Sequence, residues 1–381
     1  MTKKTARRVL VIGGGAGGLA AAVAAAGDGA DVTILEKANR VGKKLLKTGN
    51  GRCNLSNINV SPEGYNRPAF VQPLLDKTGC GELRAFFASL GLWTVSDDAG
   101  RVYPRSDTAA SVLDVLRLAA ADNGASEMCS TEVTAIRPRG DGGFAVETRE
   151  NGELTADRVI VATGGGTALL RPLGFETVPF APVLCPLKTD PGPIRGLSGL
   201  RLKCRAELRR GGKTVYAESG EILFRDFGVS GILALDLSRH ALPGDELGLD
   251  LLPEMSREEL RARLAERTAL GRDRGEMLTG VFHRRVNEAL LRAAGGDDPE
   301  ALAGVMKDYR LTVLGPGDTQ NAQVTRGGAA ADQFDPLTLE SRRVPGLYCV
   351  GEALDIDGRC GGYNLHWAFV SGLAAGRSAA Q

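Results

Sequence analysis

Residues 9–37 read VLVIGGGAGGLAAAVAAAGDGADVTILEK. The short apolar run at 9–12 predicts a buried β-strand, and residues 32–35 predict a second one. Between them a glycine-rich turn leads into residues 15–26, an alanine-rich segment that we expect to form a helix thin enough to lie close against a sheet. The order strand, glycine turn, helix, strand predicts a βαβ unit with parallel strands.

The glycines of this turn follow the spacing GxGxxG, with Gly13, Gly15 and Gly18 at the three positions. In a dinucleotide site the first glycine permits the tight turn, the second lets the backbone approach a pyrophosphate, and the third lets the helix pack closely. The N-terminus of the helix offers N–H groups to the anion. Glu36 ends the second strand, roughly 20 residues past the glycines, where an acid accepts hydrogen bonds from ribose hydroxyls. Together these features predict dinucleotide binding, whereas the glycine spacing alone also suits a plain βαβ turn.

The overall composition is that of a globular protein with more than one domain: 381 residues, 43% hydrophobic and 24% charged. The formal net charge of +1 argues against nucleic acid or a membrane surface as a partner. The seven scattered cysteines predict neither a disulfide framework nor a metal site, and they favour a reducing, cytoplasmic location. The basic N-terminus resembles a signal peptide, but its apolar part continues into the glycine turn, so we expect neither export nor a membrane span.

Three later segments have the character of loops that pass close to a cofactor. They are Thr48–Asn54 (TGNGRCN), Thr163–Gly165 after a strand, and Gly351–Leu365, where a strand ends in Gly-Glu before a glycine turn and the last helix. An acid at position 352 is placed to bind ribityl hydroxyls. The N-terminus of the last helix, directed at the N1/C2=O edge of a flavin, would stabilise the negative charge of the reduced ring. The two ends of the chain therefore predict one FAD site.

The segment between these ends reads as an insertion. Alternating strands within residues 202–224 predict an antiparallel β region, and a capping box at Ser256 and Glu259 opens the first of three short helices. The second helix is expected at 277–294 and the third from 299 to about 309, whereas residues 56–76 are expected to be a loop. The predicted domains are a FAD-binding domain at 1–185 and 320–381, an inserted β domain at 186–255 and 311–319, and a helical subdomain at 256–310.

These motifs resemble the BaiN-like NAD(P)/FAD-dependent oxidoreductases, a family that includes aminoacetone-oxidase-type flavoproteins. The resemblance covers nearly the whole chain and rests most on TGNGRCN and GGYNLHWA, together with RVYPRSD, VIVATGGG and GEILFRDFGVSG. It implies an α/β fold of the two-dinucleotide-binding-domains flavoprotein type: a Rossmann-like FAD-binding domain with an inserted antiparallel β-barrel-like domain and a small helical domain. Cys360 and His366 stand where the family usually has Thr and Gln, which leaves the catalytic set open.

The predicted site residues fall into two groups. Arg52, Cys53 and His366 are the catalytic candidates. The predicted cofactor-binding residues are Gly13, Gly15, Ala16, Gly17, Gly18, Glu36, Lys37, Lys44, Gly49, Arg52, Cys53, Asn54, Val133, Thr163, Gly164, Gly165, Gly351, Glu352, Gly361, Gly362, Tyr363, Asn364 and Leu365, and no metal ligand is expected.

Each catalytic candidate has a structural alternative. Arg52 would hold a substrate carboxylate or carbonyl or stabilise anionic flavin, or else it only positions its loop. Cys53 is either redox-active, with Cys360 as a hypothetical partner, or a packed small hydrophobe. His366 opposes the helix dipole if it is protonated, so we expect it to work neutral, as a hydrogen-bond partner, a proton donor or a packing group.

The expected function is that of an FAD-dependent oxidoreductase that passes a hydride through flavin N5. From the resemblance, reduction of an activated C=C bond in a small organic substrate is one reaction, and amine oxidation is the alternative. No second GxGxxG is present, so NADH or NADPH would bind only transiently, or the electrons come from elsewhere. A flavoprotein that acts on RNA is the alternative from another class. The basic stretch 201–213 is the only sequence feature that supports the RNA alternative. A third alternative is a flavin-binding redox sensor without turnover.

Overall fold

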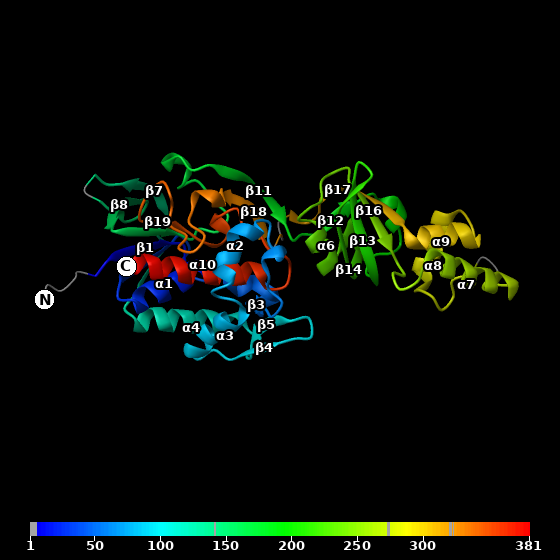
Figure 1. Cartoon of the computed structure of the whole chain (residues 1–381), viewed down its shortest axis with the longest axis horizontal. Helices are drawn as coiled ribbons and strands as arrows, with labels where there is room; N and C mark the ends of the chain where they lie inside the picture. Colours follow the sequence, from blue (N-terminus) through cyan, green and yellow to red (C-terminus); the bar gives the residue numbers. More distant parts are fainter. Residues whose placement is uncertain (1–5, 141, 273–274, 320–321, 323) are drawn as a thin grey trace. The chain divides into compact units, whose positions relative to one another are not determined.

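The computed structural model describes residues 6–140, 142–272, 275–319, 322 and 324–381. The chain forms two compact units. The first unit comprises Met1–Ala181 and Val324–Gln381, and the second comprises Pro182–Gln323 (Figure 1). Within the described residues, no helix is long and apolar enough to cross a bilayer, and no cluster of three or more His, Cys, Asp or Glu could hold a metal ion.

The first unit is built on a parallel five-stranded sheet of order β19-β10-β1-β2-β6. In the central strand, Val11 lies opposite Ile34 on one side and Ile160 on the other. The sheet is apolar because it is covered on both faces, as parallel sheets require. Its strands are β1 (Arg8–Ile12), β2 (Asp31–Glu36), β6 (Ser126–Cys129), β10 (Arg158–Val161) and β19 (Leu347–Cys349).

Two helices with small side chains pack backbone to backbone in this unit. They are α1 (Ala16–Gly27) and α10 (Tyr363–Ala380), which lie side by side in Figure 1. A Cβ added at Gly372 would stand 2.2 Å from the carbonyl oxygen of Gly17, and one at Gly376 would stand 2.3 Å from that of Ala21. This close approach joins the N-terminal and C-terminal segments of the chain into one structure.

Smaller elements complete the first unit. Residues 68–75 form α2, so the prediction of a loop over 56–76 is wrong there: burial of Val71, Leu74 and Leu75 outweighs the helix-breaking signal of the prolines. The elements are α2 (Pro68–Leu75), α3 (Cys80–Ser89), α4 (Ala109–Asp122), β3 (Ser56–Asn57), β4 (Thr94–Ser96), β5 (Arg101–Pro104), β7 (Val133–Pro138), β8 (Phe144–Thr148), β9 (Gly152–Ala156), β11 (Thr177–Val183) and β18 (Val324–Ala329).

The second unit is a closed barrel of order β12-β15-β14-β13-β16-β17, with a helical segment inserted between β16 and β17. The barrel and the helices share one hydrophobic core, in which Leu249 of β16 and Leu290 of α8 are both buried. The elements are β12 (Leu187–Thr189), α5 (Pro191–Ile194), β13 (Arg201–Arg210), β14 (Lys213–Arg225), β15 (Gly228–Ser230), α6 (Ile232–Leu237), β16 (Glu246–Asp250), α7 (Arg257–Ala269), α8 (Arg284–Ala294), α9 (Pro299–Lys307) and β17 (Tyr309–Pro316).

This architecture confirms the predicted α/β fold with an inserted antiparallel barrel. The capping box at Ser256 and Glu259 forms as predicted. The helix predicted at 277–294 begins only at Arg284, because Gly280 has φ +81° and His283 caps the helix through a hydrogen bond from the Arg285 N–H. The separation of a β domain from a helical subdomain stays a prediction.

Candidate functional site

The carboxyl ends of the parallel strands bring the predicted loops to one edge of the sheet, where ligands bind in such folds. The turn after β1 is tight because Gly13 has φ +106°, and a Cβ there would lie 2.5 Å from the carbonyl oxygen of Ala162. A Cβ at Gly18 would lie 1.9 Å from the carbonyl oxygen of Gly13. Only glycine fits these two positions, in agreement with the roles assigned to them.

Gly15 is different, because its neighbourhood is open. It is the N-cap of α1, its backbone is extended with φ −83°, and no side chain caps the helix. A Cβ added there would meet no atom within 4 Å. The first N–H groups of α1, from Ala16 and Gly17 onward, have no intrahelical partner and carry the positive end of the helix dipole. This is the environment of an anion-binding cradle.

Glu36 ties the end of β2 to the glycine turn. One carboxylate oxygen accepts from the Gly14 N–H and the other from the Ala38 N–H, each at 2.8 Å. The segment that leads to Val133 is attached to the same place, since the Thr131 N–H donates to the carbonyl oxygen of Glu36 at 2.9 Å. The chain just before Val133 is therefore attached to the end of β2 at Glu36, about a hundred residues earlier in the sequence.

An ion pair joins Lys44 to Glu352 at the same edge of the sheet. Gly164 is adjacent, since a Cβ there would lie 3.7 Å from Glu352 Oε2. The Gly42 N–H donates to the carbonyl oxygen of Gly14 at 2.7 Å, which places the chain just before Lys44 beside the first glycine turn. The predicted segments 163–165 and 351–352 thus meet the predicted residue Lys44 at this edge, and the pairing of Lys44 with Glu352 was not predicted.

The TGNGRCN loop has an unusual backbone. Gly49, Asn50, Gly51 and Cys53 all have positive φ, between +55° and +85°. Non-glycine residues in this region are strained and cluster at functional sites. The loop is held by hydrogen bonds from the Cys53 N–H to the Thr48 carbonyl oxygen at 3.0 Å and from Thr48 Oγ1 to Leu45 at 2.6 Å.

Asn54 connects this loop to the start of α10. With its amide oriented to satisfy its neighbours, Asn54 accepts from the Gly362 N–H at 3.1 Å and donates to the Ser56 carbonyl oxygen at 2.9 Å. Gly361 and Gly362 have φ +102° and +103°, and no side chain caps the helix that follows. The N-terminus of α10 and the TGNGRCN loop are therefore one connected structure.

The side chains of Tyr363 and Asn364 bind their own chain. Tyr363 Oη donates to the carbonyl oxygen of Asn59 at 2.9 Å. The Asn364 amide accepts from the Gly358 N–H at 2.8 Å and donates to the Gly358 carbonyl oxygen at 2.9 Å. Any contact of these two residues with a cofactor would therefore use their backbone atoms, whereas the predicted cofactor contact of Leu365 stays a prediction.

His366 lies in the core and is fully buried. Its Nδ1 lies 2.9 Å from Ser56 Oγ, and its Nε2 lies 3.2 Å from the carbonyl oxygen of Thr78. A carbonyl only accepts, so Nε2 carries the proton and Nδ1 accepts from the serine hydroxyl. Burial lowers the pKa of His366 to about 4, so the ring is neutral at physiological pH. This geometry supports the packing role among the alternatives for His366.

The buried imidazole predicts an acid-sensitive fold. The folded pKa lies below the unfolded value of about 6.5, so the unfolded chain binds more protons between these two values. The stability that the neutral ring contributes is present above pH 6.5 and is lost as the pH falls toward 4. Between pH 7.5 and pH 4.5 we expect a loss of about 2–3 kcal/mol. Urea unfolding of wild type and His366→Gln at both pH values measures it, and an equal loss in both proteins contradicts the assignment.

Cys53 is also fully buried, and burial raises the pKa of its thiol to about 12. A thiol with that pKa is protonated and unreactive at neutral pH. No disulfide joins Cys53 to Cys360. The structure therefore favours the packing alternative for Cys53 and offers no support for the hypothetical redox pair.

Arg52 differs from the other two catalytic candidates because its side chain is 49% exposed. Its Nε donates to Asp107 Oδ1 at 2.5 Å, and its Cζ lies 4.3 Å from the centre of the Tyr103 ring. The hydrogen bond to Asp107 raises the pKa of Arg52, so the guanidinium stays charged. Sequence reasoning missed Tyr103 and Asp107, although both lie in the RVYPRSD motif.

Comparison with known proteins identifies the family. The family model described as the HI0933-like protein Rossmann domain matches residues 7–378. The chain belongs to the HI0933-like family. The relationship agrees with the fold and with the convergence of glycine loops at one edge of the sheet. This HI0933-like protein is an FAD-dependent oxidoreductase.

Three curated relatives span nearly the same length. A 3-dehydro-bile acid delta(4,6)-reductase of Clostridium scindens is 38% identical, covering 98% of this chain and 99% of the relative. Ribosomal RNA dihydrouridine synthases of Escherichia coli and Haemophilus influenzae are 26% and 27% identical, covering 96% and 92% of both chains. Among solved structures, a 3-ketosteroid-delta4-(5alpha)-dehydrogenase of Rhodococcus jostii has a TM-score of 0.49 at 17% identity and covers 100% of this chain and 98% of its own.

Proposed function

We propose that this HI0933-like protein reduces a C=C bond that is conjugated to a carbonyl group in a small organic substrate. Two kinds of relative support this reaction, because a delta(4,6)-reductase and a dihydrouridine synthase are both named for saturating such a bond. Bound FAD supplies the hydride through its N5 atom. NADH or NADPH is the proposed reductant and would bind transiently.

The residues at the carboxyl edge of the sheet fit FAD. The open space at Gly15 and the uncapped N-terminus of α1 suit the pyrophosphate, and Glu36 lies where the adenosine ribose would be held. Glu352, whose side chain is only 15% exposed and paired with Lys44, would bind the ribityl hydroxyls. The uncapped start of α10 at Gly362 would face the N1/C2=O edge of the ring.

The observation that carries the proposal is the position of Arg52. Its half-exposed guanidinium lies on the loop that Asn54 ties to the start of α10. A fixed positive charge suits a carbonyl oxygen that gains negative charge during reduction. The same charge repels the ammonium group of an amine substrate, which disfavours amine oxidation as the reaction.

Anaerobic stopped-flow spectroscopy tests this function directly. We expect NADH or NADPH to bleach the visible absorbance of the flavin, and an α,β-unsaturated ketone such as 2-cyclohexenone to restore it. Simple primary amines should leave the oxidised flavin unchanged. Bleaching by an amine but not by a reduced nicotinamide would instead establish an amine oxidase.

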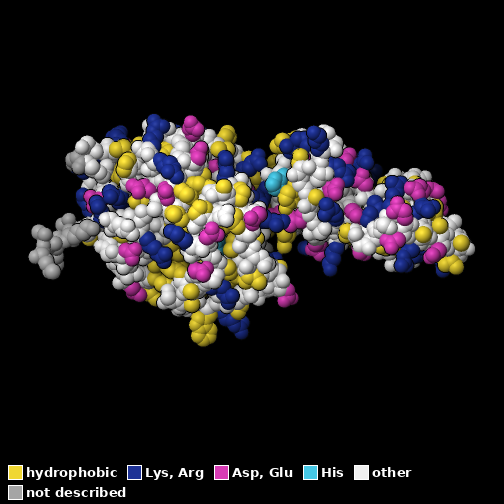
Figure 2. Space-filling model, in the orientation of Figure 1, with side chains coloured by type: hydrophobic (Ala, Val, Ile, Leu, Met, Phe, Trp, Pro, Cys, Tyr) yellow, Lys and Arg dark blue, Asp and Glu magenta, His cyan; other side chains and the backbone are white. Residues whose placement is uncertain are grey.

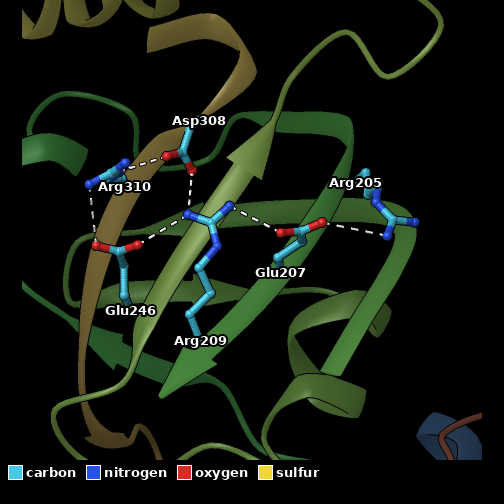
Figure 3. A network of polar contacts seen from close by, with 6 residues as sticks. All are labelled: Arg205, Glu207, Arg209, Glu246, Asp308 and Arg310. Atoms are coloured by element: carbon cyan, nitrogen blue, oxygen red, sulfur yellow. Dashed lines mark hydrogen bonds and ion pairs between the residues drawn. The ribbon is translucent and has the colours of Figure 1, made fainter. Parts of the chain in front are cut away.

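An RNA substrate is the second candidate, favoured by the two ribosomal RNA dihydrouridine synthases among the relatives. The basic stretch 201–213 does not strengthen it, because tertiary neighbours neutralise most of its arginines. Arg209 donates to Asp308 at 2.8 Å (Figure 3). Glu207 and Glu246 each accept from Arg209 at 3.1 Å. The further ion pairs are Arg201–Glu221, Arg205–Glu207 and Arg210–Asp245.

The mixed charge of the surface also gives no support to a basic RNA-binding face. Figure 2 shows basic and acidic side chains interspersed over the visible face of both units. An RNA-binding protein would show binding that falls steeply with salt. Turnover of unmodified ribosomal RNA, with no turnover of 2-cyclohexenone, would favour the RNA candidate over a small substrate.

A further inference from the structure

We propose that Arg52 binds the carbonyl oxygen of the substrate, and that Asp107 and Tyr103 act as positioning residues that hold its guanidinium in place. This inference rests on the proposed function and extends it, because it names the chemical group by which the substrate is recognised. All three residues belong to the first unit.

The contacts of Arg52 leave part of the guanidinium available. The described contacts are the 2.5 Å hydrogen bond from Nε to Asp107 and the stacking of Cζ over the Tyr103 ring at 4.3 Å. A guanidinium has five N–H donors, and this hydrogen bond uses the one on Nε. The donors of the two terminal NH₂ groups therefore remain available. The hydrogen bond to Asp107 and the stacking on Tyr103 together fix the orientation of the guanidinium plane.

The two holding residues stand on rigid local structure. Tyr103 is 7% exposed and lies in β5, which pairs with β3 on one side and β4 on the other. Asp107 has φ +56°, and its N–H donates to the Pro104 carbonyl oxygen at 2.9 Å. Aspartate tolerates this left-handed conformation in turns, and the hydrogen bond to Pro104 closes the turn. The turn directs a carboxylate toward Arg52 immediately before α4 begins.

The chemistry of conjugate reduction needs such a group. The β-carbon of the substrate accepts the hydride, the C=C π-bond breaks, and its electron pair moves toward the carbonyl oxygen. The α-carbon then accepts a proton from water, so that one reduced nicotinamide and one proton saturate one double bond. The guanidinium of Arg52, kept charged by Asp107, stabilises the negative charge that the carbonyl oxygen carries between these two steps.

Steady-state kinetics of the FAD-loaded enzyme with 2-cyclohexenone test the three roles. We expect Arg52→Gln to lower kcat about 100-fold, as removal of one oxyanion donor does. Asp107→Asn and Tyr103→Leu should each raise KM and lower kcat by about tenfold, because the guanidinium remains but is less well oriented. Tyr103→Phe keeps the ring and should retain wild-type kinetics. Arg105→Gln removes a nearby arginine outside this cluster and is the matched control.

A binding measurement separates this inference from the proposed reaction. Without reductant, 2-cyclohexenone is titrated into the oxidised holoenzyme while the flavin absorbance is followed. Compared at equal FAD loading, we expect Arg52→Gln to bind 2-cyclohexenone at least tenfold more weakly than wild type, with an unchanged thermal midpoint. If wild type binds in this way but does not turn over, the reaction fails and the carbonyl site stands. If wild type turns over and Arg52→Gln has unchanged kcat, KM and Kd, the carbonyl site is overturned.

Discussion

Gly15→Ala is expected to weaken FAD binding by at least about tenfold without destabilising the apoprotein. The added methyl group meets no protein atom within 4 Å, and the backbone at φ −83° accepts alanine without strain. The methyl would instead occupy the space in front of the N-terminus of α1, where a pyrophosphate must approach the backbone. The measurements are the Kd for FAD by fluorescence titration and the urea midpoint of the apoprotein.

The control for this variant is Gly81→Ala. Gly81 also lies at the start of a helix, α3, and a Cβ there also meets no atom within 4 Å. Only Gly15 stands at the carboxyl edge of the parallel sheet, so Gly81→Ala should bind FAD as wild type does. An unchanged FAD affinity in Gly15→Ala would show that the pyrophosphate does not lie against this turn.

Gly372→Ala is expected to lower the free energy of unfolding by about 1–3 kcal/mol and to weaken FAD binding as well. Its methyl group would stand 2.2 Å from the carbonyl oxygen of Gly17 and 3.1 Å from Ala20 Cβ. Backbone atoms cannot rotate away, so α10 must move off α1. Gly17 lies in the first turn of α1, and the movement therefore reaches the proposed pyrophosphate site. Urea unfolding of the FAD-saturated protein measures the first effect.

Gly376→Ala provides an independent repeat, because its methyl would stand 2.3 Å from the Ala21 carbonyl oxygen, one helical turn farther along. It should destabilise the fold to a similar degree but affect FAD less, since Ala21 is farther from the start of α1. Gly81→Ala again serves as the control for a methyl added at an open helical position. Wild-type stability in both α10 variants would contradict the described packing of α1 against α10.

The glycine turn and the parallel strands could be predicted from sequence because their signals are local. Gly18 is required by its contact with Gly13 inside one βαβ unit, and Gly13 by the positive φ of the turn, which the order strand, turn, helix and strand already implies. The helix over 68–75 was missed because its stabilisation comes from burial of Val71 and Leu74 against distant parts of the chain. The prolines of this segment, considered locally, predicted a loop instead of a helix.

For the catalytic candidates too, the sequence revealed the motif position, whereas only the structure revealed the burial of each side chain. From sequence, Arg52, Cys53 and His366 each had a catalytic and a structural alternative. Their burial separates them: Cys53 and His366 are enclosed, whereas Arg52 is 49% exposed. Likewise, the basic stretch around Arg209 was the only sequence feature in support of the RNA alternative, and the fold places Asp308 and Glu246 beside it. Charge pairing across strands cannot be read from one strand alone.

The sequence by itself determined the α/β class, the dinucleotide turn and the inserted β region, because backbone conformation and hydrophobic periodicity act over a few residues. Only the tertiary structure decided which polar groups are paired and which remain available. The ion pair between Lys44 and Glu352 and the contact of Arg52 with Asp107 join residues from separate segments. Burial and electrostatic interaction depend on distance in space, so they become defined only when the chain has folded.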